Sequence, residues 1–64
     1  MSYQEIFCKI LEMLDEEFDF NYNINKVEFE ENEVFVYLES GTEKFESKFT
    51  ITDRNVSADY LFEM

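Results

Sequence analysis

The first part of the chain carries apolar residues at the spacing of an amphipathic helix. They recur every three or four positions and have two apolar neighbours beside them: Phe7, Ile10, Leu11, Leu14 and Phe18, flanked by Ile6 and Met13. Ser2 and Glu5 form a capping box, in which the serine accepts a backbone N–H of the first turn and the glutamate reaches back. The pattern predicts a helix over residues 3–18.

The middle of the chain changes to a period of two. Apolar and polar residues alternate around 27–29, 34–38 and 45–51, which is typical of strands with one buried face and one solvent-facing face. Two-residue turns at Glu31–Asn32 and Ser40–Gly41 would join these strands into an antiparallel meander, because Asn and Gly tolerate a positive φ.

The two turns predict a register that keeps the apolar residues together on one face. They set these residues opposite one another: Phe29 and Val34, Val27 and Val36, Val36 and Phe45, Val34 and Ser47, Glu33 and Lys48, Tyr37 and Lys44. Agreement between side-chain matching and turn chemistry favours the meander more strongly than the propensity of any single residue.

The alternation breaks at 53–55, and Ser57 is a candidate N-cap for a short terminal helix that would bury Leu61 and Phe62. We therefore expect one acidic α+β domain over residues 1–64. Its N-terminal helix packs on the Val/Phe face of a three-stranded antiparallel meander, and a short C-terminal helix follows, giving the order αβββα.

The charge of the chain is strongly one-sided. Sixteen acidic residues stand against five basic ones, without any histidine, and the formal net charge is −11. Solubility alone needs a charge of about 2–8 in magnitude, and the 45% hydrophobic content excludes a disordered acidic tail. This excess suits a positively charged protein as partner and disfavours direct contact with nucleic acid or an anionic membrane.

Two acidic clusters are candidates for that contact. One crowds the end of the predicted helix, where the helix dipole disfavours anions: Asp15, Glu16, Glu17 and Asp19. The other follows the predicted hairpins: Glu28, Glu30, Glu31, Glu33, Glu39, Glu43 and Glu46. Carboxylates at strand and helix spacings could replace a row of backbone phosphates in a basic groove. The alternative is that both clusters only solvate the surface.

Aromatic residues also fall on the predicted polar face, where alternation places Phe35 and Tyr37. Phe20, Tyr22 and Ile24 alternate in the opposite phase to the strand that follows, which predicts a break near Asn25. Together these side chains would form an apolar patch rimmed by Glu28, Glu39 and Glu46. The patch would be covered by the terminal helix or a second copy, or would supply the aromatic anchors of a binding surface.

Catalytic, cofactor and metal chemistry find little support in the sequence. The lack of histidine removes the commonest general base and metal ligand, and Gly41 is the only glycine, so no phosphate-binding loop is present. Cys8, the only cysteine, excludes an intramolecular disulfide and is expected to pack beside the core. Oxygen-bearing residues within 19–30 fall at the ligand positions of a calcium loop, but Ile24 replaces the required glycine and Lys26 the apolar residue, so the alternation favours a strand. We expect no enzymatic activity, no cofactor and no metal site.

These properties favour a small cytoplasmic inhibitor that mimics DNA or RNA phosphates and blocks a basic nucleic-acid-binding enzyme or effector complex. In size, acidity and α+β build the chain resembles the small anti-defence proteins of phages, including anti-CRISPR and anti-restriction proteins; the resemblance implies no residue roles. An immunity or antitoxin protein against a basic toxin, and a non-inhibitory accessory subunit or homodimer, are the alternatives. The candidate partner-binding residues are Asp15, Glu16, Asp19, Glu28, Glu30, Glu31, Glu33, Phe35, Tyr37, Glu39 and Glu46.

Overall fold

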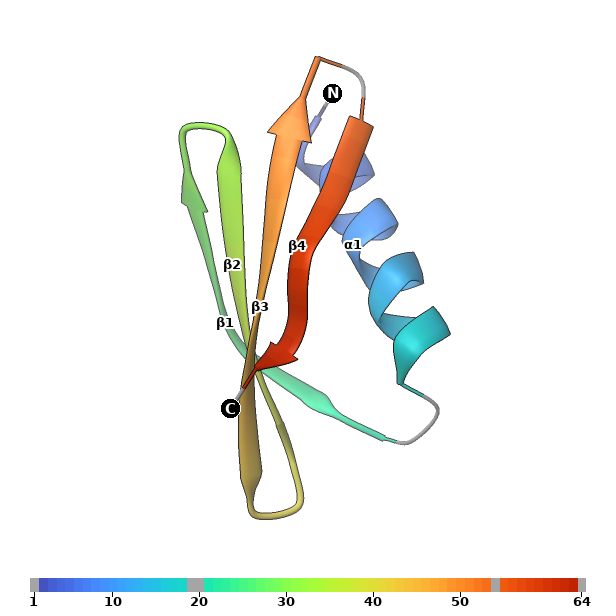
Figure 1. The fold of residues 1–64 in the computed structure, drawn as a ribbon, viewed down its shortest axis with the longest axis vertical. Coiled ribbons are helices and arrows are strands. Elements are labelled where there is room, and N and C mark those ends of the chain that lie inside the picture. Colours follow the sequence, from blue (N-terminus) through green and yellow to red (C-terminus); the bar gives the residue numbers. More distant parts are fainter. Residues whose placement is uncertain (1, 19–20, 54, 64) are drawn as a thin grey trace.

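The computed structural model describes residues 2–18, 21–53 and 55–63. Over these ranges the chain forms one helix and an antiparallel sheet with strand order β1-β2-β3-β4 (Figure 1). The elements are α1 (Tyr3–Glu17), β1 (Asn23–Glu30), β2 (Glu33–Ser40), β3 (Glu43–Thr52) and β4 (Asn55–Glu63). The α+β class is therefore confirmed, whereas the expected number of strands and the C-terminal helix are not.

The N-terminal helix follows from its local signals. The Ser2 hydroxyl accepts the N–H of Glu5 at 3.2 Å and donates to the Glu5 carboxylate, also at 3.2 Å. At the other end, the N–H of Phe18 donates to the Leu14 carbonyl at 2.9 Å. The capping box at Ser2 is confirmed, and the helix ends one residue before the predicted boundary.

The buried stripe of α1 differs slightly from the one that we expected. Ile6, Ile10 and Leu14 are buried, whereas Phe7 and Leu11 are only half-buried. The two stripes lie side by side on the helix and both are apolar, so spacing alone does not separate them. Contact with the sheet decides which one faces inward.

The first hairpin has the predicted register, with Val27 opposite Val36 and Phe29 opposite Val34. The predicted register of the second hairpin was wrong, because its turn lies at Gly41–Thr42 rather than one residue earlier. Gly41 takes the positive φ of +63° that this turn requires. The side chains keep their faces, since the pairing moves by two positions and strand side chains alternate with a period of two.

The physical reason for the shifted turn lies in the pairs that it creates. Leu38 now stands opposite Phe45, and Val34 stands opposite Phe49. Larger apolar side chains therefore meet across the two central strands than in the predicted register, where Val34 would have met Ser47. Such cross-strand pairs are the main local stabilisation of a sheet.

The predicted break near Asn25 is confirmed as a β-bulge, because the register shifts between Ile24 and Lys26. Its consequence differs from the one that we expected. The bulge brings Ile24, opposite Leu38, onto the same face as Val27, so Ile24 packs against the core.

The predicted C-terminal helix was wrong, because the segment forms the edge strand β4. Val56 lies opposite Ile51, and Ala58 lies opposite Phe49. A helix here would have left the backbone N–H and C=O groups along the free edge of β3 without partners. The strand β4 pairs with these groups and buries Val56. Backbone pairing with β3 therefore outweighs the local preference of Ser57 to begin a helix.

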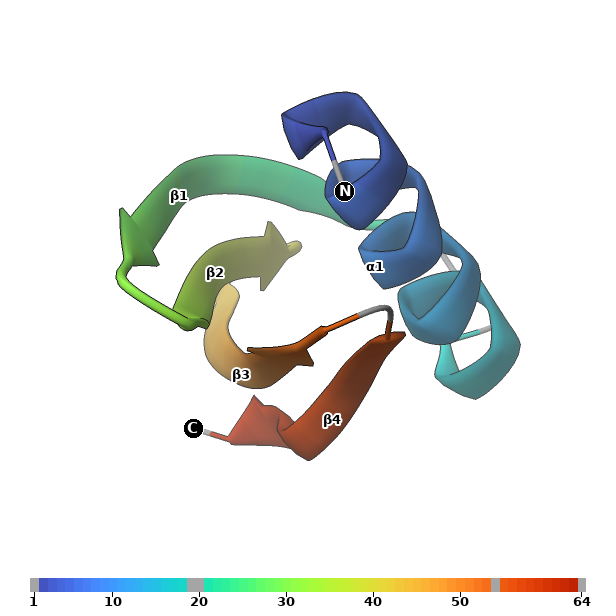
Figure 2. The ribbon, with the colours of Figure 1, turned by 90° about the horizontal axis from the view of Figure 1, so that it is seen from above.

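One face of the sheet forms the core, as expected from the Val/Phe alternation. In Figure 2 the curled sheet holds α1 on its inner side. The buried apolar side chains come from the helix and from three strands: Ile6, Ile10, Leu14, Val34, Val36, Leu38, Phe49 and Val56. We call this side of the sheet the inner face and the opposite side, which α1 does not cover, the outer face.

Ser47 is a buried polar residue on the inner face. Its hydroxyl accepts the N–H of Phe62 at 3.0 Å, at a point where β4 is irregular and Phe62 has a φ of +55°. The irregular pairing of β3 with β4 leaves the backbone N–H of Phe62 without a strand partner, and the Ser47 hydroxyl accepts it. This explains why a serine is buried among Val and Phe side chains.

Candidate functional site: the outer face of the sheet

The outer face gathers most of the strand charges. Cross-strand partners share a face, so the pairing of Glu28 with Phe35, Phe35 with Lys48 and Lys48 with Tyr60 runs across all four strands. The carboxylates of this face are Glu28, Glu30, Glu33, Glu39, Glu46, Asp59 and Glu63, and its lysines are Lys26, Lys44 and Lys48. It is therefore a wide acidic surface with few cations.

Lys48 is the central cation of this face. Its ammonium lies 2.6 Å from the carboxylate of Glu33, 3.7 Å from that of Asp59 and 5.7 Å from the ring centre of Phe35. The hydrogen bond with Glu33 and the charges of Glu33 and Asp59 raise the pKa of Lys48. The predicted proximity of Glu33 and Lys48 is confirmed, although Glu33 stands directly opposite Thr50 and reaches Lys48 diagonally.

Two tyrosines hold further carboxylates on this face. The Tyr60 hydroxyl donates to Glu46 at 2.8 Å, and this bond, together with burial, raises the pKa of Tyr60. Burial and hydrogen bonding to Glu28 and Glu46 raise the pKa of Tyr37 to about 12. The neutral phenol of Tyr60 therefore fixes the position of Glu46 without cancelling its charge.

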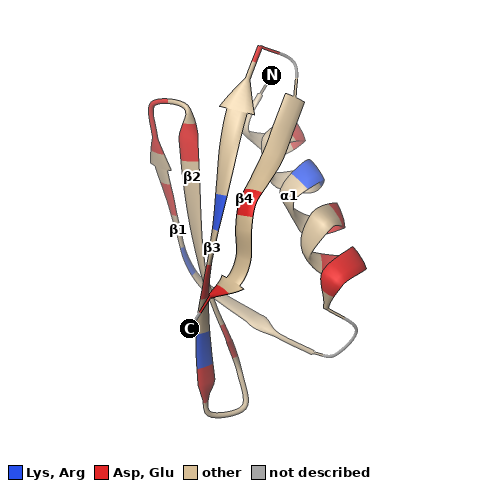
Figure 3. Cartoon of the chain, viewed as in Figure 1, with Lys and Arg blue, Asp and Glu red and all other residues tan. Residues whose placement is uncertain are grey.

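The two acidic clusters expected from the sequence lie on different sides of the molecule. Figure 3 shows acidic residues on the strands, at the hairpin ends and along α1. Glu28, Glu33 and Glu46 join the network of the outer face, and Glu30 and Glu39 lie on the same face near opposite ends of β2. The helix acids belong to the other side of the sheet, so they do not extend the strand surface.

At the helix end, Asp15 and Glu16 are exposed, and Asp19 lies outside the described residues. Asp15 accepts the hydroxyl of Tyr22 at 2.8 Å. Burial and this hydrogen bond raise the pKa of Tyr22 to about 12. The last turn of α1 has no basic residue, so Glu16 faces the helix dipole without compensation within the described residues.

The β1–β2 turn concentrates another group of acids. Glu30 stands opposite Glu33 at the end of the hairpin, which places like charges side by side. Glu33 is paired with Lys48, whereas Glu30 has no ion pair among the described residues. Glu31 follows with a φ of +32°, a left-handed conformation that glycine or asparagine adopts more readily.

The predicted aromatic patch forms only in part. Phe35 and Tyr37 do lie on the face away from the core, but the terminal helix that could have covered them is absent, and both are half-buried among polar side chains. Tyr22 and Ile24 instead pack against the core. Phe20 lies outside the described residues.

The residues that β4 contributes to this face were not predicted from the sequence. Asp59 accepts the hydroxyl of Thr50 at 2.7 Å and approaches Lys48, while Tyr60 holds Glu46. Both were assigned to a helix. The alternation of Val56 and Ala58 with the polar Ser57 and Asp59 was the signal that would have indicated a strand, up to the irregularity that moves Tyr60 onto the outer face.

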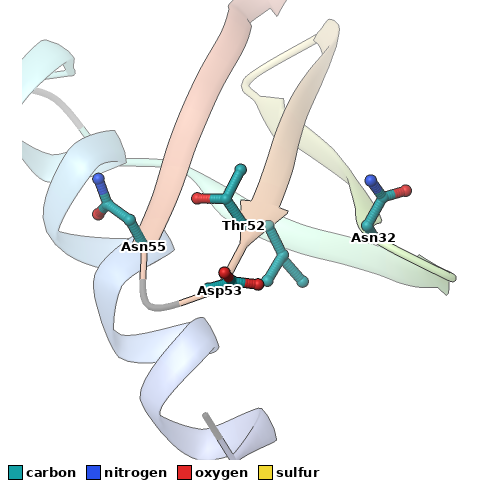
Figure 4. Close-up of a pocket in the computed structure, with 5 residues that line it drawn as sticks. Asn32, Thr52, Asp53 and Asn55 are labelled. Atoms are coloured by element: carbon teal, nitrogen blue, oxygen red, sulfur yellow. The ribbon is translucent and has the colours of Figure 1, made fainter.

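Other candidate sites are less developed. Figure 4 shows a shallow hollow between two turns, lined by Asn32, Ile51, Thr52, Asp53 and Asn55. Its polar groups are partly used within the chain, since the Asn55 side chain accepts the N–H of Val56 and the Asn32 carbonyl accepts that of Ile51. Cys8 was expected to pack beside the core, but it is exposed on α1.

Among the described residues, no His, Cys, Asp and Glu side chains group as metal ligands would. Likewise, the described part of the chain holds no helix with both the length and the apolar character needed to cross a membrane. The segment that partly matches a calcium loop is largely extended backbone, as its alternation favoured, because Asn23–Glu30 forms β1.

The fold and the site define an α+β protein in which one helix covers one face of a four-stranded antiparallel sheet and the other face presents carboxylates. The chain matches no protein-family model, no curated protein sequence and no solved structure.

Proposed function

We propose that this protein binds a basic protein through the outer face of its sheet and occupies a groove that otherwise holds nucleic acid. The observation that carries the proposal is that all four strands contribute carboxylates to the one sheet face that α1 leaves uncovered. Alternate residues of a strand lie about 6.6 Å apart and neighbouring strands about 4.8 Å apart, so the charges form a closely spaced array.

The hydrogen bonds of the outer face also support this function. Glu46 is held by the hydrogen bond from the Tyr60 hydroxyl, so its carboxylate loses little side-chain freedom when a cation binds. Arginine and lysine side chains that contact phosphates would meet fixed carboxylates instead. The net charge of −11 steers the encounter with a cationic surface.

The target class is a nucleic-acid-binding enzyme or effector complex, as for the anti-defence proteins that the chain resembles in composition. An immunity protein against a basic nuclease toxin would use the same surface, and the identity of the captured target separates the two. Either role suits a reducing cytoplasm, where the exposed thiol of Cys8 stays free.

Binding to a purified target in the presence of competitor DNA tests the proposal. The target is first captured from host lysate with tagged protein, at low and at high salt. DNA and salt should each release it. A target that stays bound under both challenges would contradict the mimicry of nucleic acid.

Two charge-matched variants locate the binding face. The first changes Glu30, Glu39 and Glu63 to Gln; these outer-face acids have no ion pair among the described residues, so the Lys48 network stays intact. The control changes Glu12, Glu16 and Glu17, exposed on α1, to Gln and alters the net charge equally. We expect the first to weaken binding at least tenfold and the control less than threefold. Equal effects would show that net charge, not the outer face, drives binding.

A further inference from the structure

The free edge of β1 is the second surface that a partner can use. In the described part of the chain β1 pairs with β2 alone, and its strand positions are exposed or half-buried. The bulge disturbs only its beginning, so Lys26–Glu30 pairs with β2 in an unbroken register. The backbone groups on the far side of these residues are open to another extended segment.

The other edge of the sheet is less suited to such pairing. The register of β4 with β3 shifts twice, between Glu46 and Lys48 and between Lys48 and Phe49, and Phe62 has a positive φ. Irregular edges resist the addition of a strand. The regular half of β1 therefore stands out as the accessible edge.

An exposed aromatic pair adjoins the end of this edge. Tyr3, at the start of α1, is 72% exposed and Phe29 of β1 is 41% exposed, with their ring centres 4.8 Å apart. The inner-face position of Phe29 and the outer-face positions of Glu28 and Glu30 alternate along the strand. A segment beside β1 would meet apolar rings on one side and carboxylates on the other.

We infer that the edge of β1 over Lys26–Glu30, with Tyr3, binds an extended segment of the basic target in which arginines alternate with apolar residues. The inference rests on the proposed function and names the part of the target that it takes. Arginines two residues apart reach Glu28 and Glu30, because alternate strand positions have matching spacing. The apolar residue between them covers Phe29 and Tyr3, and main-chain pairing adds a fifth strand.

Charge complementarity selects this occupant over a second copy of the chain. A second copy would bring another net charge of −11 to an edge that already carries uncompensated Glu30. A basic segment instead removes the repulsion between Glu30 and Glu33.

The test uses a nine-residue peptide of alternating arginine and valine. Its control has the same composition, with the arginines and valines in separate blocks. We expect the alternating peptide to bind at least fivefold more tightly. The amides within residues 27–30 that point away from β2, every second one, should gain protection from hydrogen exchange. Equal binding of the two peptides, no binding at all, or protection confined to other segments would overturn the inference.

Single substitutions sharpen the test with the full chain. Glu30→Gln should weaken peptide binding about two- to fivefold and Tyr3→Ala about three- to tenfold. Glu43→Gln changes the same charge at the exposed start of β3 and should alter binding less than twofold. If Glu43→Gln weakens binding as much as Glu30→Gln, the edge is not the site.

The same variants in the DNA-competition assay separate this inference from the proposed function. If the target is still released by DNA but Tyr3→Ala binds it as tightly as the parent protein, the β1 edge is excluded and the proposed function stands. If no target is released by DNA, the proposed function fails independently of the peptide result. A peptide-free dimer with residues 27–30 already protected would assign the edge to a second copy.

Discussion

The inner and outer faces of the sheet are built from alternate residues of the same strands, yet they differ in what holds them together. On the inner face, Val34, Val36 and Phe49 are fully buried against α1. On the outer face, the intervening Phe35 and Lys48 are half-buried and interact through charge and hydrogen bonds. Burial of apolar area makes the first face responsible for stability, while the second stays in water and remains available to a partner.

This contrast explains how so small and acidic a chain can fold. The repulsion among the carboxylates is confined to the outer face, the turns and the exposed side of α1, where water screens it. Within the outer face, Lys48 and the tyrosine hydroxyls offset part of it. Among the described residues, the buried part of the inner face holds no ionised side chain and contributes stability through its apolar contacts.

The largest expected loss of stability comes from a substitution on the inner face. Phe49→Ala removes a side chain with 0% exposure, and we expect a loss of about 3–5 kcal/mol in the free energy of unfolding. This is comparable to the whole stability of a domain of this size. Phe35→Ala, on the outer face of the neighbouring strand, should cost about 1–2 kcal/mol. Urea unfolding measures both, and similar costs would contradict the division of roles between the faces.

A smaller loss is expected from the polar residue of the inner face. Ser47→Ala leaves the N–H of Phe62 without its acceptor and should cost about 1–2 kcal/mol. Ser57→Ala, at an exposed position of β4, is the control and should change stability by less than about 0.5 kcal/mol. Equal unfolding midpoints for the two variants would show that the Ser47 bond contributes nothing.

Alkaline titration compares the tyrosines of the two faces. Tyr22, which packs against the core, and Tyr37 on the outer face both have their pKa raised to about 12 from an unfolded value of about 10. The neutral phenol is favoured in the folded state, so this stabilisation is complete below about pH 10 and is lost as the pH rises through about 12.

We expect Tyr22→Phe and Tyr37→Phe each to reduce the fall in unfolding free energy between pH 10 and 12. Urea unfolding at pH 10, 11 and 12 measures the slope. Their double variant should reduce it further, because the two tyrosines lie on opposite sides of the sheet. An unchanged slope in both single variants would refute the assignment.

The two non-glycine residues with positive φ in the described part of the chain, Glu31 and Phe62, allow a comparison of backbone strain. Glu31→Gly should stabilise the fold by about 0.5–1 kcal/mol, because an exposed glutamate gains nothing from a φ of +32°. Phe62→Gly should destabilise it, because the Phe62 ring stacks on Phe18 with ring centres 3.9 Å apart. Thermal melts that show a loss for Glu31→Gly would argue against strain at the turn.

The smallest effect concerns the exposed end of α1. Glu16→Gln and Glu17→Gln should each raise the free energy of unfolding by about 0.3 kcal/mol at low salt, since the helix dipole disfavours anions there. Raising the salt concentration should remove the gain. Lys9→Gln, in the middle of the same helix, is the control and should not stabilise. A gain that persists in high salt would require another explanation.

The helix and the first hairpin were predictable because their signals are local. Ser2 and Glu5 define where α1 begins, and the β1–β2 turn sets the pairing of Val27 with Val36. The turn of the second hairpin was predicted one residue too early, because the predicted and the observed registers both keep the apolar residues on one face. The observed register differs in that Leu38 stands opposite Phe45 and Phe49 opposite Val34, which gives larger apolar contacts.

The candidate site was predictable to a smaller extent. The positions of Phe35 and Tyr37 away from the core followed from alternation. The approach of Glu33 to Lys48 was also expected, but that of Asp59 was not, because Asp59 reaches this network only through the pairing of β4 with β3. The spacing of residues along the chain does not predict contacts between strands that are distant in the sequence.

By itself the sequence determined the net charge, the amphipathic helix, the two faces of the central strands and the lack of histidine. The tertiary structure decided that the last segment is a strand, that the helix acids and the strand acids lie on different sides of the sheet, and that β1 keeps a free edge. The physical reason is that an unpaired strand edge and a shared core depend on residues far apart in the chain, and their free energy outweighs the weaker preference of Ser57 to begin a helix.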